Sequence, residues 1–273
     1  MDLSVLAGAW ADYDIERHNP PRADVMEGYR AASRAAAAPR MVLGEAYGPG
    51  EREKLDLLAP AETGVPAIVF IHGGYWRAGA REDRRYPASF FVPRGIAWIS
   101  LGYPLTGTTP LPGIVDSVRR AAAYLKGNAA RLGLDPSRLV LVGNSAGAHL
   151  AAMALLAAPD APAWRGAALV SGVYDLVPYL DFEIARASGI TRANAEGLSP
   201  LRLRRPLSLP VALTLGEREP PMFHRHTELF AAHLAALGAT VERIPGAGHD
   251  HFSIIGELGR DGALTRAMLK MAL

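Results

Sequence analysis

The sequence contains no cysteine among its 273 residues. This absence excludes a disulfide framework, thiolate zinc sites, iron–sulfur clusters and a cysteine nucleophile. An excess of one charge is also missing, because 29 Lys and Arg face 27 Asp and Glu and leave a formal net charge of +2. We interpret the densest cationic stretch as a solvated loop, since no aromatic residues are interleaved with Arg202, Arg204 and Arg205. This pattern argues against nucleic acid as a partner.

Long hydrophobic runs are absent as well, and no stretch of 18 or more apolar residues could span a membrane. The N-terminal segment has no basic region of the kind found in signal peptides, and Asp12 and Asp14 interrupt its apolar residues. We therefore expect a cytoplasmic protein with no membrane partner. The composition, 49% hydrophobic and 21% charged, is that of an ordinary globular protein and excludes wholesale disorder.

From residue 66 onward, short apolar runs alternate with helical patterns. Continuous apolar character predicts strands, buried on both faces, at 67–71, 95–101, 139–142, 167–170, 211–215 and 240–244. Apolar spacing predicts helices at 114–132, 146–157, 227–237 and 258–273. This alternation favours an α/β fold with a mostly parallel sheet and helices on both of its faces. We expect one domain over residues 1–273.

Three segments fall outside that alternation. Residues 1–40 are Ala-rich and predict a helical N-terminal segment. Residues 41–59 alternate in the manner of an antiparallel hairpin. Residues 179–210 are a candidate cap or lid insertion, so that any cap over the sheet is small.

The motif GNSAG at residues 143–147 lies between a predicted strand and a predicted helix. In that context G-x-S-x-G forms a sharp turn that raises the serine hydroxyl above the sheet edge, which makes Ser145 the candidate nucleophile. The N–H of Ala146 would lie at the helix N-terminus, unpaired within the helix and directed at developing negative charge. The alternative is a tight turn with a structural serine.

A second motif, HGGYW at residues 72–76, directly follows the strand predicted at 67–71. Consecutive glycines allow the amides of Gly73 and Gly74 to approach an oxyanion. His72 precedes the nucleophile by a whole βαβ unit, so we expect it to brace this loop rather than act as a base. Tyr75 and Trp76 are either core residues or the wall of a pocket for a flat substrate.

A serine nucleophile requires a base, and the base requires an acid that fixes its tautomer. In this fold the order along the chain is Ser, acid, His, which places the acid directly after the strand at 211–215. Glu219 is preferred to Glu217, because three residues beyond Gly216 give the loop room to turn back over the sheet. Asp175, which follows an earlier strand, is a third candidate.

The base is expected in the loop after the last strand, where His249 and His251 compete. The two cannot both point at Ser145. His149 lies one turn into the nucleophile helix, a packing position, and is interpreted as structural. The other histidines near a helix are expected to face solvent or the sheet: His224, His226 and His233.

Together, HGGYW, GNSAG, SGVYDL and HDHFS resemble the α/β-hydrolase type of kynurenine formamidase (arylformamidase), over most of residues 47–255. The resemblance implies an α/β-hydrolase fold and hydrolysis of N-formylkynurenine to kynurenine and formate in tryptophan degradation, with no cofactor and no metal. Residue by residue, it implies that Ser145 is the nucleophile, Glu219 the acid and His251 the base. The resemblance also implies that the oxyanion donors are Gly73, Gly74 and Ala146.

Two departures from that family bear on the substrate. Asn144 stands where His or Asp is more common before the nucleophile, and Glu219 stands where Asp is the more common acid. A general carboxylesterase acting on small acyl esters shares every catalytic part and differs only in its pocket. A non-catalytic binding protein is the third class, and the complete Ser, acid, His order disfavours it. The expected partner is a small-molecule substrate, and a homodimer is compatible with these features.

Overall fold

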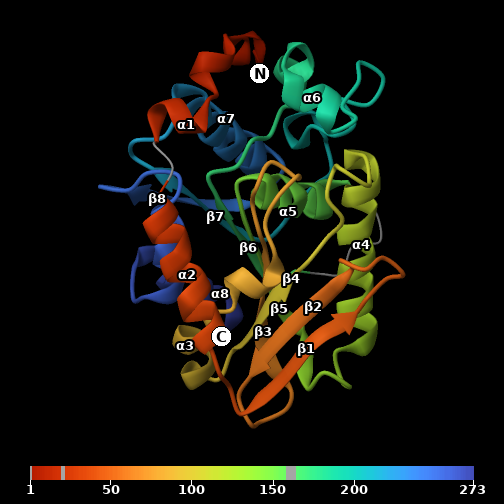
Figure 1. Ribbon diagram of the computed structural model, residues 1–273, viewed down its shortest axis with the longest axis vertical. Helices are drawn as coiled ribbons and strands as arrows, with labels where there is room; N and C mark the ends of the chain where they lie inside the picture. Colours follow the sequence, from red (N-terminus) through yellow and green to blue (C-terminus); the bar gives the residue numbers. More distant parts are fainter. Residues whose placement is uncertain (1, 20–21, 158–163) are drawn as a thin grey trace.

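The computed structural model describes residues 2–19, 22–157 and 164–273 (Figure 1). Its centre is one eight-stranded sheet in the order β1-β2-β4-β3-β5-β6-β7-β8. The strands are β1 (Arg40–Ala46), β2 (Lys54–Ala59), β3 (Val65–Ile71), β4 (Ala97–Leu101), β5 (Leu134–Asn144), β6 (Gly166–Val170), β7 (Pro210–Gly216) and β8 (Thr240–Gly246). The α-helices are α1 (Ile15–His18), α2 (Ala23–Ala35), α3 (Ala88–Phe91), α4 (Leu111–Asn128), α5 (Ala146–Leu156), α6 (Glu183–Ala187), α7 (Pro221–Ala236) and α8 (Ala263–Ala272).

The sheet has the predicted parallel character. Strands β3 to β8 pair in parallel, whereas β1 and β2 form the expected antiparallel hairpin and β2 joins β4 antiparallel. Parallel strands need crossover connections, which place helices on the faces of the sheet. Because all these parallel strands end at one edge, the loops that follow β3, β5, β7 and β8 meet there.

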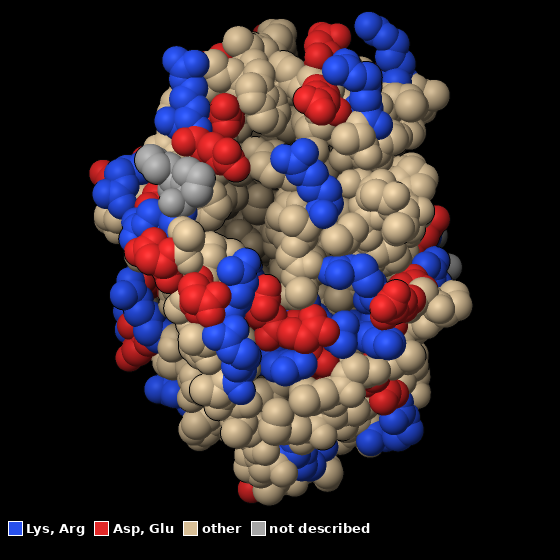
Figure 2. Space-filling model, in the orientation of Figure 1, with Lys and Arg blue, Asp and Glu red and all other residues tan. Residues whose placement is uncertain are grey.

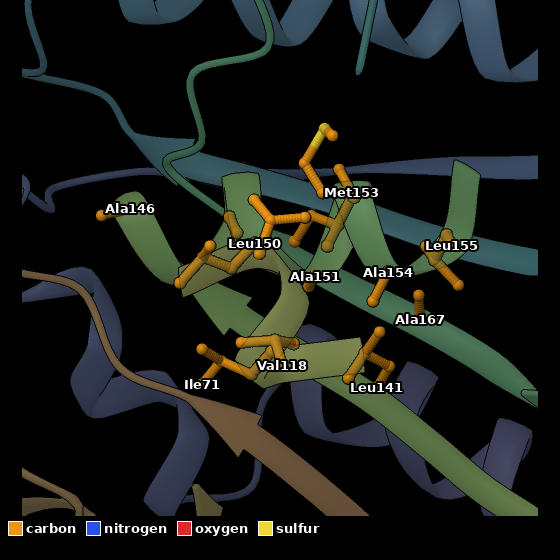
Figure 3. Packing of buried hydrophobic residues seen from close by; sticks show 14 of the residues in the cluster. Ile71, Val118, Leu141, Ala146, Leu150, Ala151, Met153, Ala154, Leu155 and Ala167 are labelled. Atoms are coloured by element: carbon orange, nitrogen blue, oxygen red, sulfur yellow. The ribbon is translucent and has the colours of Figure 1, made fainter. Parts of the chain in front are cut away.

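Two hydrophobic clusters, one on each face of the sheet, hold the helices in place. In β3, alternate residues point to opposite faces, so Val69 and Ile71 join the cluster with α4, α5 and α7, and Ile68 and Phe70 join the cluster with α3 and α8. Figure 3 shows the first cluster from close by, with α5 packed against β3, β5 and β6. Each buried leucine or valine there stabilises the fold by about 1.5–3 kcal/mol.

Several predicted boundaries are corrected by the structure. Helix α7 starts six residues earlier than predicted, at Pro221, since proline is favoured in the first turn, where its missing N–H is no loss. The single helix predicted at 258–273 is divided into a 3₁₀ segment, Ile254–Gly259, and α8, because Gly262 adopts an extended conformation before α8. The N-terminal segment is helical only in part, and residues 179–210 contain the short helix α6. No helix within the described residues is long and apolar enough to cross a membrane.

Asp56 joins the hairpin to the loop after β3. Its buried carboxylate accepts hydrogen bonds from the Gly44 N–H at 2.8 Å, from Arg81 Nε at 3.1 Å and from Arg85 Nη2 at 2.7 Å. Replacing one partner of a buried ion pair leaves the other charges uncompensated.

We expect Asp56→Ala to lower the free energy of unfolding by about 3–5 kcal/mol, measured by urea denaturation. The control is Asp116→Ala, because Asp116 pairs with Arg119 on the exposed face of α4 and such pairs contribute about 0–1 kcal/mol. Equal losses in the two variants would contradict this account of Asp56.

Candidate active site

Ser145 lies in the turn between β5 and α5, with φ 55° and ψ −122°. A positive φ is unfavourable for a residue with a side chain, so its neighbours must hold the strained turn in place. The flanking glycines make this possible. A Cβ at Gly143 would lie 2.2 Å from the carbonyl oxygen of Gly147, and a Cβ at Gly147 would lie 2.1 Å from that of Ile71. The close approach of the chain in this turn therefore requires glycine at both positions.

The side chains of Ser145, His251 and Glu219 form one hydrogen-bonded chain. His251 Nε2 lies 3.1 Å from Ser145 Oγ, and His251 Nδ1 lies 2.7 Å from Glu219 Oε2. Because a carboxylate can only accept, Nδ1 carries the proton and Nε2 is free to accept from the serine hydroxyl. All three residues are buried. The donor and acceptor order is that of Ser–His–acid triads.

Glu219 is held by two further contacts. Its Oε1 accepts hydrogen bonds from the N–H of Gly216, at 2.7 Å, and from the hydroxyl of Ser171. Ser171, at the end of β6, is a site residue that the sequence reasoning missed, although the motif SGVYDL contains it. By contrast, Glu217 is exposed and accepts from the N–H of Gly248, away from Ser145.

The third acid candidate lies elsewhere. Asp175 is fully buried and binds the guanidinium of Arg202 through both carboxylate oxygens, at 3.0 and 2.9 Å. For Arg202, this ion pair corrects the interpretation of the cationic stretch as a solvated loop, whereas Arg204 is an exposed loop residue as expected. Arg202 is half-buried, and Arg204 donates to the carbonyl of Leu201 and contacts His233.

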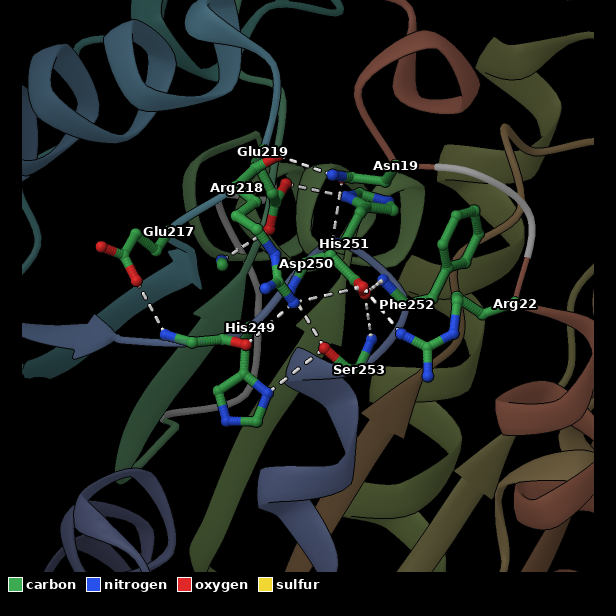
Figure 4. Close-up of polar contacts among 12 residues, drawn as sticks. Asn19, Arg22, Glu217, Arg218, Glu219, His249, Asp250, His251, Phe252 and Ser253 are labelled. Atoms are coloured by element: carbon green, nitrogen blue, oxygen red, sulfur yellow. Dashed lines mark hydrogen bonds and ion pairs between the residues drawn. The ribbon is translucent and has the colours of Figure 1, made fainter.

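Figure 4 shows how the last loop separates the two competing histidines. His251 points to Glu219, whereas His249 contacts Ser253 and Glu257 on the other side of the loop. Asp250 between them accepts hydrogen bonds from the N–H groups of Phe252 and Ser253, at 3.0 and 2.8 Å, which tightens the turn.

The N-terminal segment fixes this loop in a way that the sequence reasoning did not anticipate. The amide of Asn19, just after α1, donates to the carbonyl of Arg218 at 2.6 Å and accepts from the N–H of His251 at 3.1 Å. Arg22 pairs with Asp250 at 3.2 Å. Asn19 thus bridges the loop of the acid and the loop of the histidine (Figure 4).

One predicted oxyanion donor is corrected. The N–H of Gly73 donates to Asn144 Oδ1 at 3.1 Å, so it is already occupied. Within the described part of the chain, the N–H groups of Gly74, Tyr75 and Ala146 have no acceptor and remain available. The free N–H of Tyr75 was not anticipated from the sequence, because the positive φ of 50° at this residue cannot be inferred from residue types.

His72 braces the oxyanion loop, as expected. Its Nδ1 contacts the carbonyl oxygen of Gly73 at 2.8 Å, its ring stacks on Tyr103 with centroids 4.3 Å apart, and the Tyr103 hydroxyl donates to the carbonyl of His72. Burial lowers the pKa of His72 to about 3. A ring of such low basicity, enclosed by the protein, is unsuited to act as the base.

A pocket of about 240 Å³ opens beside Ser145. The nucleophile, His251, Gly74 and Tyr75 line it from the sheet edge, and residues of α2 close it from the other side. Figure 2 shows the hollow on this face, with charged side chains along its rim. Trp76 does not line it. Its ring is 1% exposed and packs edge-on against His149 at 5.2 Å, so only the core interpretation holds for Trp76.

No group of three or more His, Cys, Asp or Glu side chains in the described residues is arranged to hold a metal ion. The remaining histidines divide as expected between surface and interior. His224 is exposed, and His226 and His233 are buried.

The chain is similar to known proteins in sequence and in structure. A family model described as BD-FAE matches residues 55–163. The chain is 33% identical over 253 residues to a kynurenine formamidase from Salmo salar, covering 87% of this chain and 84% of that protein. It is 30% identical to esterase LipQ of Mycobacterium tuberculosis, covering 74% of this chain and 55% of that protein. A solved structure, a putative thioesterase from Silicibacter sp. tm1040, matches with a TM-score of 0.84 at 24% identity, covering 94% of this chain and 97% of that one.

The sheet, the turn at Ser145 and these neighbours define the protein as an enzyme of the α/β-hydrolase fold. Within that class, its similarity over most of its length shows that the chain belongs to the kynurenine formamidase family.

Burial lowers the pKa of His72 to about 3 and the pKa values of His149 and His226 to about 4. In the unfolded chain a histidine titrates near 6.5, so between about pH 6.5 and 4 the unfolded state binds more protons than the folded state. The free energy of unfolding therefore decreases as the pH is lowered through this range. We expect each buried histidine to contribute a slope of about 1.4 kcal/mol per pH unit in the lower part of this window. Urea denaturation from pH 7 to 4.5 measures this slope.

The variant His149→Gln tests the assignment, because glutamine can still donate to the carbonyl of Leu198, which His149 Nε2 contacts at 2.8 Å. In this variant the slope of unfolding free energy against pH should decrease by the contribution of about one proton. Identical slopes in the wild type and the variant would contradict the assignment of His149.

Proposed function

We propose that the protein is a serine hydrolase that cleaves the N-formyl group of an aryl formamide, with N-formylkynurenine as the expected substrate. The observation that carries the chemistry is the hydrogen-bonded chain from Ser145 through His251 to Glu219 at the mouth of the pocket. The observation that carries the substrate is family membership.

In the first half of the proposed reaction, Ser145 Oγ attacks the formyl carbon while His251 Nε2 takes its proton. Glu219 stabilises the imidazolium that forms. The developing oxyanion lies at the free N–H groups of Gly74, Tyr75 and Ala146. Each such donor is worth about 2.7–4 kcal/mol of transition-state stabilisation in comparable enzymes.

In the second half, the His251 imidazolium gives its proton to the leaving aryl amine, and the C–N bond breaks. A water molecule, deprotonated by the same His251, then attacks the formyl ester of Ser145. Formate leaves, and the serine recovers its proton. An aryl amine leaves more readily than an alkyl amine, so this sequence requires no metal.

Tyr75 supports an aromatic substrate. Its ring lies between the pocket at Ser145 and a second pocket that it shares with Trp10 and Phe182. An aromatic leaving group that stacks offset or edge-on against such a ring gains about 0.5–1.5 kcal/mol beyond area burial.

A general carboxylesterase acting on small acyl esters is the second candidate. The similarity to esterase LipQ favours it, and the same triad and oxyanion donors would serve an ester. The two candidates differ in the leaving group and in the length of acyl chain that the pocket accepts.

We expect His251→Ala to lower kcat by about a million-fold, like Ser145→Ala, because members of a triad act as a unit. The matched control is His249→Ala, two residues away in the same loop and bonded to Ser253 instead. It should retain activity within about ten-fold. Steady-state kinetics with an aryl ester measures all three variants, and a dead His249→Ala beside an active His251→Ala would overturn the assignment of the base.

The acyl specificity separates the two candidate functions. A tight acyl site excludes longer chains sterically, so activity should fall steeply from formyl or acetyl to butyryl, and N-formylkynurenine should exceed simple esters in kcat/KM. The measurement is a p-nitrophenyl ester series beside N-formylkynurenine. A flat or rising profile, with no turnover of N-formylkynurenine, would assign the protein to the carboxylesterases.

A further inference from the structure

The pocket beside Ser145 is lined by an arginine that forms no ion pair with any described residue. Arg84, the last residue of a 3₁₀ segment (Arg81–Arg84), lines this pocket and is 6% exposed. The one hydrogen bond of its side chain to a described residue joins Nη1 to the backbone carbonyl of Asp83 at 2.9 Å. Nε is buried without a partner, and Nη2 has no acceptor among the described residues. No ion pair to Arg84 exists within the same part of the chain.

The surrounding carboxylates form no ion pair with this cation. Asp83 also lines the pocket, but its carboxylate is paired with Arg30 Nε at 3.4 Å, and Arg30 itself lines the pocket. Glu16 is an exposed residue of the N-terminal segment that also borders the pocket. From the other side, Tyr29 of α2 and Tyr86 contribute neutral hydroxyls, and burial raises the pKa of both.

The position of Arg84 is rigid. Its backbone carbonyl accepts hydrogen bonds from Trp98 Nε1 at 2.8 Å and from Ser100 Oγ at 2.6 Å, both in β4. These contacts fix the backbone of Arg84 in the wall of the pocket, and the residue as a whole is buried there. A buried charge that stays unpaired costs several kcal/mol, and arginines are rarely buried unless paired. A ligand that enters the pocket can supply the missing partner.

We propose that Arg84 binds a carboxylate of the substrate, so that the pocket beside Ser145 selects aryl acyl compounds that carry an anionic group away from the reacting carbonyl. This inference rests on the proposed function and deepens it, because N-formylkynurenine carries an α-carboxylate at the end remote from its formyl group. Arginine suits this role, since its planar guanidinium remains charged and forms charge-assisted hydrogen bonds with carboxylates.

The experiment compares each charged substrate with a neutral partner. N-formylkynurenine is paired with formanilide, and 4-acetoxyphenylacetate is paired with phenyl acetate. We expect Arg84→Met to lower the ratio of kcat/KM between the charged and the neutral member by about 10- to 100-fold, mainly through KM, as expected for the loss of one charge-assisted hydrogen bond. Arg84→Lys, which keeps the charge, should lower the ratio less. Arg119→Met, which removes an exposed arginine on α4, controls for net charge and should leave the ratio unchanged.

The outcomes separate the two proposals. A ratio that stays at the wild-type value in both Arg84 variants overturns the role of Arg84, because a merely structural arginine would affect both members alike. If the wild type hydrolyses neither formamide, the proposed function fails, while the ester pair still reports on Arg84. If Arg84→Met does not fold, Arg84→Lys decides by the same ratio. A wild type that prefers the neutral member of both pairs also overturns the proposal.

Discussion

The constraint on which the site depends is the strained backbone of Ser145, held where β5 meets α5. The turn exists only because the chain passes very close to itself at Gly143 and Gly147. The Ser145 N–H donates to the carbonyl of Val170 in the neighbouring strand at 2.7 Å, so the sheet itself anchors Ser145. The strain is compensated by the hydrophobic cluster that packs α5 onto β3 and β5.

That anchoring extends to the other site residues through short, direct contacts. Asn144 holds the Gly73 N–H, which couples the turn of the nucleophile to the oxyanion loop. Asn19 couples the loops of Glu219 and His251 to the N-terminal segment. The N-terminal segment therefore does more than extend the domain, since α2 closes the pocket and Asn19 holds the backbone of His251. Several elements must support a site in this way if the distances between its reacting groups are to stay constant within a few tenths of an ångström.

Most of the fold could be predicted from the sequence, because continuous apolar runs and glycine-flanked turns have few alternative structures. The choice between His249 and His251 could not be derived from residue types, since it depends on the turn that Asp250 forms with Ser253. The occupied N–H of Gly73 was missed, and the choice between core and pocket wall for Trp76 stayed open, for the same reason: both depend on contacts between segments far apart in the chain. The family resemblance predicted His251 as the base, and the turn at Asp250 gives the physical reason for this choice.

The glutamate in the place of the more common aspartate follows from the same contacts. The Glu219 N–H donates to the carbonyl of Gly216 at 3.2 Å, so the loop after β7 turns back at once and its backbone stays close to the strand. The longer side chain then spans the remaining gap, with Oε1 against Gly216 and Ser171 and Oε2 against His251. Both carboxylate oxygens accept hydrogen bonds, and these contacts fix the orientation of the carboxylate. A shorter aspartate would need a loop whose backbone extends further toward the histidine. An aspartate at this position would lack one methylene of reach, and it would have to abandon either the histidine or the strand end.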